Sequence, residues 1–134
     1  MTREKVVFVC LHGAAKSVIA AELFKQRAAA AGRSVEAVAL GLEPDPEVSP
    51  ATAAGLLAEG MDVRHLRPRA AVAADFADAA RVVAFGCDVS ALTPPGLPVE
   101  QWADIPAVSD GYALARERIG ARVDRLVNER LHAL

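Results

Sequence analysis

The sequence predicts an α/β fold in three layers (α/β/α), with a four-stranded parallel sheet between helices. Short valine-rich runs alternate along the chain with alanine-rich segments of helical length. This alternation is typical of parallel sheets, because a crossover helix must separate two parallel strands. No internal repeat or linker-like stretch interrupts the 134 residues, so we expect a single domain over residues 1–134.

The first half of the chain is expected to form two strands and two helices. Residues 5–9 are β-branched and aromatic, which indicates a buried strand. Residues 17–31 are alanine-rich and predict a helix, which the following glycine ends. Residues 34–40 alternate like a strand. A second helix is predicted from Pro50 to about residue 59, because a serine precedes this proline and can cap the first turn.

The second half is expected to complete the sheet and end on a long helix. Residues 75–80 predict a short helix, and residues 81–85 predict a third buried strand. A short fourth strand is expected near residues 99–102. The last helix is predicted from Asp110 to about Leu131. Its expected inner face is formed by Leu114, Ile119, Val123 and Leu126 or Val127.

Charge and composition exclude several classes of function. The formal net charge is −2, and no basic excess suggests a nucleic-acid partner. No apolar run approaches the length of a membrane span, and the start "MTREK" has no secretory signal. The two cysteines, Cys10 and Cys87, are too few for a disulfide framework. We therefore expect a cytoplasmic protein with reduced thiols.

The stretch "VVFVCLHGAAKS" predicts an oxyanion site with a sulfur nucleophile. Cys10 ends the first strand, and a short loop leads into the first helix, whose N-terminus carries a positive partial charge. Gly13 permits a positive φ, which lets backbone N–H groups converge on an anion. Lys16 adds a cation, and Ser17 can hydrogen-bond the thiolate or cap the helix. A cysteine in such a field is stabilised as the nucleophilic thiolate.

These residues resemble the N-terminal motif of the low-molecular-weight protein tyrosine phosphatases and the related thiol-dependent arsenate reductases. In that motif a strand is followed by Cys, five residues, Arg, Ser or Thr, and a helix containing Ala-Glu. Cys10, Ser17, Ala21 and Glu22 match it. The resemblance implies a flavodoxin-like fold, a cysteinyl-phosphate on Cys10, and no cofactor or metal. It also implies a substrate-binding loop of Leu11, His12, Gly13, Ala14, Ala15, Lys16 and Ser17.

The sequence departs from the family pattern at four places, one of which is Ala15, where many members have a second loop cysteine. Lys16 replaces the arginine, and lysine is a point charge where arginine grips an oxyanion with two parallel donors. The Gly-Asn pair of the loop is His12-Gly13 here. The general acid of the family is an aspartate before a proline, ahead of the last helix. Asp104, in "DIP", is the predicted acid, and Asp110 is the alternative.

Three functions fit this pattern. The first is a phosphatase that uses Cys10, Lys16 and Asp104 on a phosphorylated substrate, with low activity expected because lysine replaces arginine. The second is an arsenate reductase in which Cys10 works with a small thiol such as mycothiol or glutathione, because Cys87 alone cannot complete a relay of three thiols. The third is a module that binds phosphate or another oxyanion without turnover.

Overall fold

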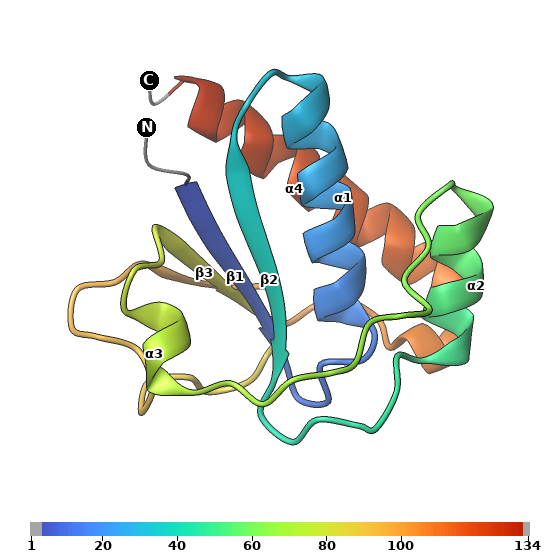
Figure 1. Ribbon diagram of the computed structural model, residues 1–134, viewed down its shortest axis with the longest axis horizontal. Helices are drawn as coiled ribbons and strands as arrows, with labels where there is room; N and C mark the ends of the chain where they lie inside the picture. The colour runs from blue at the N-terminus through green and yellow to red at the C-terminus, as the bar shows by residue number, and fades with distance from the viewer. Residues whose placement is uncertain (1–3, 133–134) are drawn as a thin grey trace.

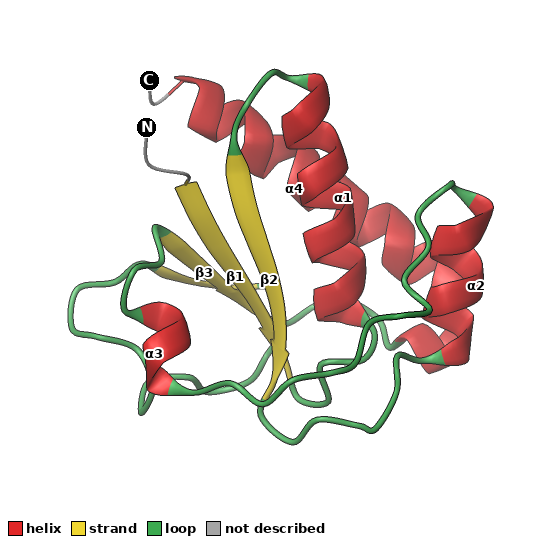
Figure 2. Ribbon diagram, viewed as in Figure 1, coloured by secondary structure: helices red, strands yellow, loops and turns green. Residues whose placement is uncertain are grey.

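The computed structural model describes residues 4–132, with side chains for residues 4–129. The domain predicted over residues 1–134 therefore extends past the described residues at both ends. Figure 2 shows the helices in red and the strands in yellow. In chain order they are β1 (Glu4–Cys10), α1 (Lys16–Ala30), β2 (Val35–Gly41), α2 (Pro50–Ala58), α3 (Ala73–Phe76), β3 (Arg81–Ala84), β4 (Val99–Gln101), a 3-10 turn (Val108–Asp110) and α4 (Tyr112–His132).

The four strands form one parallel sheet in the order β2-β1-β3-β4, which confirms the predicted fold class. β1 lies in the interior, with β2 and β3 on its two sides. Cys10, the last residue of β1, is in register with Gly41, the last residue of β2. The loops that follow the strands therefore meet at one edge of the sheet, at the bottom of Figure 1. Ligands of parallel sheets bind at this edge.

The two faces of the sheet are covered unequally. α1, α2 and α4 lie on one side, whereas α3 is the helix on the other (Figure 1). Alternate residues of β1 point to opposite faces, so Phe8 and Cys10 belong to the core under α1 and α4. Val7 and Val9 pack with Phe76 of α3 in the second core. Cys10 is thus held on the side of the sheet where the long helices begin.

Most of the predicted helix ends are confirmed, and their capping residues explain them. Gly32 has a φ of 74° and donates its N–H to the Ala29 carbonyl, which ends α1. The Ser49 hydroxyl accepts a hydrogen bond from the Thr52 N–H at 3.3 Å, with Pro50 in the first position of α2.

Two details of the sequence prediction are wrong. The short helix was expected over residues 75–80, but α3 spans Ala73–Phe76, because the Asp75 carboxylate accepts the Val72 N–H and so lies inside the first turn. Leu114 was expected on the inner face of α4 but is 45% exposed. Ala115 takes this place, since it lies on the same helical stripe as the buried Ile119 and Val123.

Asp75→Asn is expected to destabilise the protein at neutral pH by roughly 1–3 kcal/mol, because Asp75 accepts charge-assisted hydrogen bonds from Val72 and Arg69. Burial alone would raise the Asp75 pKa, but these two partners outweigh it and lower the pKa. A lowered pKa contributes stability above the unfolded carboxyl pKa, about 3.9, that is lost as the pH falls through the folded value. Urea unfolding should show the full difference at pH 7 and a smaller one at pH 3. An equal difference at both would contradict this account.

Candidate active site

The loop from Cys10 to Ser17 turns its carbonyl oxygens outward. Five of them accept backbone hydrogen bonds from the segment 42–49 and from α1. The pairs, given as acceptor and donor residue, are Cys10 and Leu42 (3.2 Å), Leu11 and Glu43 (2.7 Å), His12 and Asp45 (3.0 Å), Ala14 and Ser49 (2.9 Å), and Ala15 and Ile19 (2.9 Å). Within residues 4–132, the backbone N–H groups of residues 11–17 donate no such bond. These N–H groups remain available for an anion.

Two glycines fix this loop against the end of β2. Gly13 has a φ of 61°, as predicted from its position in the loop. A Cβ on Gly13 would lie 2.7 Å from the Gly41 nitrogen, and a Cβ on Gly41 would lie 2.7 Å from the Gly13 nitrogen. Both positions therefore require glycine, because the two backbones touch directly.

Cys10 and Ser17 face each other inside the loop. The Cys10 Sγ lies 3.1 Å from the Ser17 Oγ, and both residues are buried. The residue before α1, Ala15, offers no side-chain cap to the helix N-terminus. Of the two roles considered for Ser17, the structure thus favours the contact with sulfur. A hydroxyl that donates to a thiolate stabilises the charged form.

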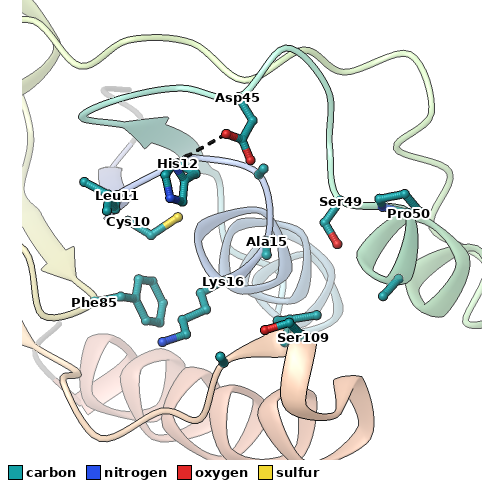
Figure 3. A pocket seen from close by; sticks show the side chains of 14 residues that line it. Cys10, Leu11, His12, Ala15, Lys16, Asp45, Ser49, Pro50, Phe85 and Ser109 are labelled. Carbon is teal, nitrogen blue, oxygen red and sulfur yellow. Dashed lines mark ion pairs between the residues drawn. The ribbon is translucent and has the colours of Figure 1, made fainter.

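Lys16 is the first residue of α1, and its ammonium is engaged with a different segment. The Nζ donates to the Ile105 carbonyl oxygen at 2.9 Å. Figure 3 shows the side chain running along the pocket toward the loop before α4. An ammonium has three N–H donors, so two remain for an oxyanion. Lys16 also connects the loop after β1 to the segment that precedes the last helix.

A pocket of about 490 Å³ opens above Cys10. Besides predicted loop residues, it is lined by residues from three other segments, of which Asp45, Ser49, Phe85 and Ser109 are shown in Figure 3. Sequence reasoning missed these four side chains. The available signal was topological, because the loops after β2 and β3 must meet the loop after β1 at the same sheet edge.

The predicted acids, Asp104 and Asp110, are absent from the described residues that line the pocket. Both carboxylate oxygens of Asp104 accept from Arg122 at 2.6 Å, and the Arg122 guanidinium lies 5.8 Å from the centre of the Trp102 ring. A hydrogen bond from its own backbone N–H, and the pairing with Arg122, lower the Asp104 pKa. The catalytic role of Asp104 stays a prediction, and the structure does not bring this residue together with Cys10.

The second cysteine lies on the opposite face of the sheet. Cys87 packs with the core under α3, and its Sγ donates to the Val9 carbonyl oxygen at 3.5 Å. Burial raises the pKa of the Cys87 thiol, and the nearby Cys10 adds to this effect. A thiol with a raised pKa is a poor nucleophile at neutral pH.

Among the side chains of residues 4–129, no group of three or more His, Cys, Asp or Glu is arranged to hold a metal ion. No helix within residues 4–132 is long and apolar enough to cross a membrane.

Comparison with known proteins identifies the family. A family model described as low molecular weight phosphotyrosine protein phosphatase matches residues 5–93. The chain belongs to this family. No curated relative matches the chain by sequence.

Solved structures of phosphatases and of arsenate reductases are both similar to this member of the family. An arsenate reductase from Archaeoglobus fulgidus is 28% identical, with a TM-score of 0.69 over 92% of this chain and 98% of that one. A low molecular weight protein tyrosine phosphatase from T. tengcongensis is 22% identical, with a TM-score of 0.72 over 94% and 99%. A thioredoxin-dependent arsenate reductase from Corynebacterium glutamicum is 23% identical, with a TM-score of 0.81 over 98% of this chain, which spans only 64% of that one.

Ser17→Ala is expected to slow alkylation of Cys10 by iodoacetamide about tenfold at neutral pH, because one hydrogen bond to a charged group is worth roughly 1.5 kcal/mol. The rate is measured in phosphate-free buffer in a Cys87→Ser background, so that only Cys10 reacts. Thr52→Val is the matched control, since the Thr52 hydroxyl is also buried but has no hydrogen-bond partner among the residues that the structure describes. An unchanged rate in Ser17→Ala would show that the hydroxyl does not stabilise the thiolate.

Proposed function

We propose that this protein is a cysteine-dependent phosphatase that hydrolyses phosphate monoesters with an aryl leaving group. The observation that carries the proposal is the hydrogen bonding of the loop: the carbonyl oxygens of Cys10, Leu11, His12 and Ala14 accept from the segment 42–49, while the N–H groups of residues 11–17 have no backbone acceptor within residues 4–132. Such an array binds a tetrahedral oxyanion and becomes more favourable as charge develops on the transferring phosphoryl group. Membership of the phosphatase family supports the same chemistry.

In the proposed reaction, the Cys10 thiolate attacks phosphorus and displaces the leaving group, which gives a cysteinyl-phosphate. The N–H groups from Leu11 to Ser17 hold the equatorial oxygens through this step. Water then attacks phosphorus, and the bonding electrons return to sulfur as thiolate. The Ser17 hydroxyl, 3.1 Å from sulfur, stabilises the thiolate both as nucleophile and as leaving group.

The walls of the pocket support an aryl leaving group. Leu11, Pro50, Phe85 and Val108 line it with apolar surface. An aromatic ring placed against these side chains would leave water, which contributes favourable binding free energy. The Lys16 ammonium supplies the charge that the family pattern gives to arginine.

Arsenate reduction is the second candidate, because arsenate and phosphate have the same shape and charge and an arsenate reductase is 28% identical to this chain. Reduction of As(V) to As(III) needs two electrons, which a pair of thiols supplies as they form a disulfide. Cys10 would form the thiol–arsenate adduct. Cys87 is a poor partner because its raised pKa keeps it protonated, so an external small thiol such as mycothiol or glutathione would supply the second sulfur.

Cys10→Ser is expected to abolish hydrolysis of 4-nitrophenyl phosphate, because an unactivated hydroxyl is a far weaker nucleophile than a thiolate. Phosphate release by the wild type and the variant measures this, and Cys87→Ser is the control. Hydrolysis that survives Cys10→Ser would overturn the mechanism. Tight phosphate binding without turnover would favour an oxyanion-binding module, and arsenite production with an added thiol would favour the reductase.

Lys16→Arg is expected to raise kcat/KM for aryl phosphates about tenfold, since one added charge-assisted hydrogen bond in the transition state is worth roughly 1.5 kcal/mol. A guanidinium can keep a bond to the Ile105 carbonyl oxygen and still present two parallel donors to the oxyanion. Lys25→Arg, on the same helix but outside the pocket above Cys10, is the matched control. A variant no faster than wild type would refute the advantage of arginine in this site.

A further inference from the structure

The proposed phosphatase reaction needs a proton donor for the leaving group, a role to which no residue has been assigned. When the P–O bond breaks, the leaving oxygen needs a proton, unless the leaving group is a very stable anion. The loop before α4 does not supply the donor in this structure, because Asp104 is held by Arg122 and is absent from the described residues lining the pocket. The donor must therefore be sought among the titratable side chains that do line it, namely Cys10, His12, Lys16 and Asp45.

His12 and Asp45 form a pair on the rim of the pocket. The His12 Nδ1 lies 3.4 Å from the Asp45 Oδ1 and 3.2 Å from the Glu43 carbonyl oxygen. Figure 3 shows the imidazole between the Cys10 thiol and the Asp45 carboxylate, which is joined to the ring by the dashed line. A histidine and a carboxylate from separate loops are thus brought together at the pocket that the proposed nucleophile lines.

The backbone fixes this pair in place. The Glu43 N–H donates to the Leu11 carbonyl oxygen at 2.7 Å, and the Asp45 N–H donates to the His12 carbonyl oxygen at 3.0 Å. The segment that carries Asp45 is therefore bonded to the loop on both sides of the imidazole. This arrangement holds the ring without burying it, since the His12 side chain is 56% exposed and can meet a substrate.

The partners of Nδ1 determine what the other ring nitrogen can do. A carbonyl oxygen and a carboxylate only accept hydrogen bonds, so both contacts require a proton on Nδ1. The Nε2 atom is then a donor in the charged imidazolium and an acceptor in the neutral ring. A carboxylate in the position of Asp45 holds a histidine ring in one tautomer and one orientation, as it does for catalytic histidines in general. The pair can therefore give a proton and take one back.

We propose that His12 is the general acid and base of this site and that Asp45 is its positioning residue, an inference that rests on the proposed phosphatase function. In the first step the P–S bond forms and the P–O bond breaks, while the leaving oxygen takes the proton from Nε2. In the second step water gives a proton to Nε2 as its oxygen attacks phosphorus. The P–S bond then breaks, and its electron pair returns to Cys10. The sum is monoester plus water to alcohol plus phosphate.

Leaving-group dependence tests this assignment. His12→Asn is expected to lower kcat/KM for phenyl phosphate about 10²–10⁴-fold, the usual contribution of general acid catalysis. It should lower kcat/KM for 2,4-dinitrophenyl phosphate much less, because dinitrophenolate leaves without a proton. Asp45→Asn should produce the same split to a smaller degree, since it leaves the imidazole in place but removes the partner of Nδ1. His65→Asn, a histidine outside the pocket, is the matched control and should leave the ratio of the two substrates unchanged.

The possible results separate this inference from the function on which it rests. Equal losses with both substrates in His12→Asn would show a binding or structural role and overturn the assignment. A split that appears in Asp104→Asn instead would give the acid role to Asp104 and overturn it as well. Either result leaves the phosphatase intact. A wild type without Cys10-dependent hydrolysis would overturn both proposals. Far-UV circular dichroism checks each variant, and Asp45→Asn carries the same test if His12→Asn does not fold.

Discussion

The contact between the backbones of Gly13 and Gly41 is the constraint on which the rest of the site depends. It brings the loop after β1 so close to the end of β2 that the next segment, residues 42–49, runs alongside and takes the loop carbonyls as hydrogen-bond acceptors. The N–H groups of residues 11–17 have no backbone acceptor within residues 4–132. Under the proposed function, an anion in the pocket would complete the hydrogen bonding of these N–H groups.

The sheet and its helices could be predicted from the sequence because local signals and tertiary packing agree there. Valine-rich runs became β1 and β3, and Ser49 with Pro50 marked the start of α2. The errors arose where one residue had two possible roles. Asp75 is a good first residue for a helix, but here its carboxylate caps the turn from inside. Leu114 is more apolar than Ala115, yet the direction of α4 buries the alanine.

The site was predictable only where its parts are adjacent in sequence. Cys10, Gly13 and Ser17 are within one loop, and each has the backbone or side-chain geometry that its position suggested. Asp45 lines the same pocket because β2 lies next to β1 in the sheet, which places the loops after the two strands side by side. A short sequence motif does not contain this information. Asp104 had the right spacing from the last helix, but Arg122, 18 residues further on, pairs with its carboxylate, and such a long-range pairing cannot be read from the sequence.

The outward carbonyls of the Cys10–Ser17 loop have an evolutionary consequence. Under the proposed function, the oxyanion is bound by main-chain N–H groups, which every amino acid except proline supplies. Substitutions at Leu11, His12 or Ala15 would change the reactivity and selectivity around the anion while leaving the anion cradle itself intact. Gly13, Gly41 and Cys10 are the exceptions, because the two glycines are required by the backbone contact and Cys10 by its thiol. Proteins that share this loop can therefore change the reaction they catalyse on phosphate-like anions while they keep the ability to bind those anions.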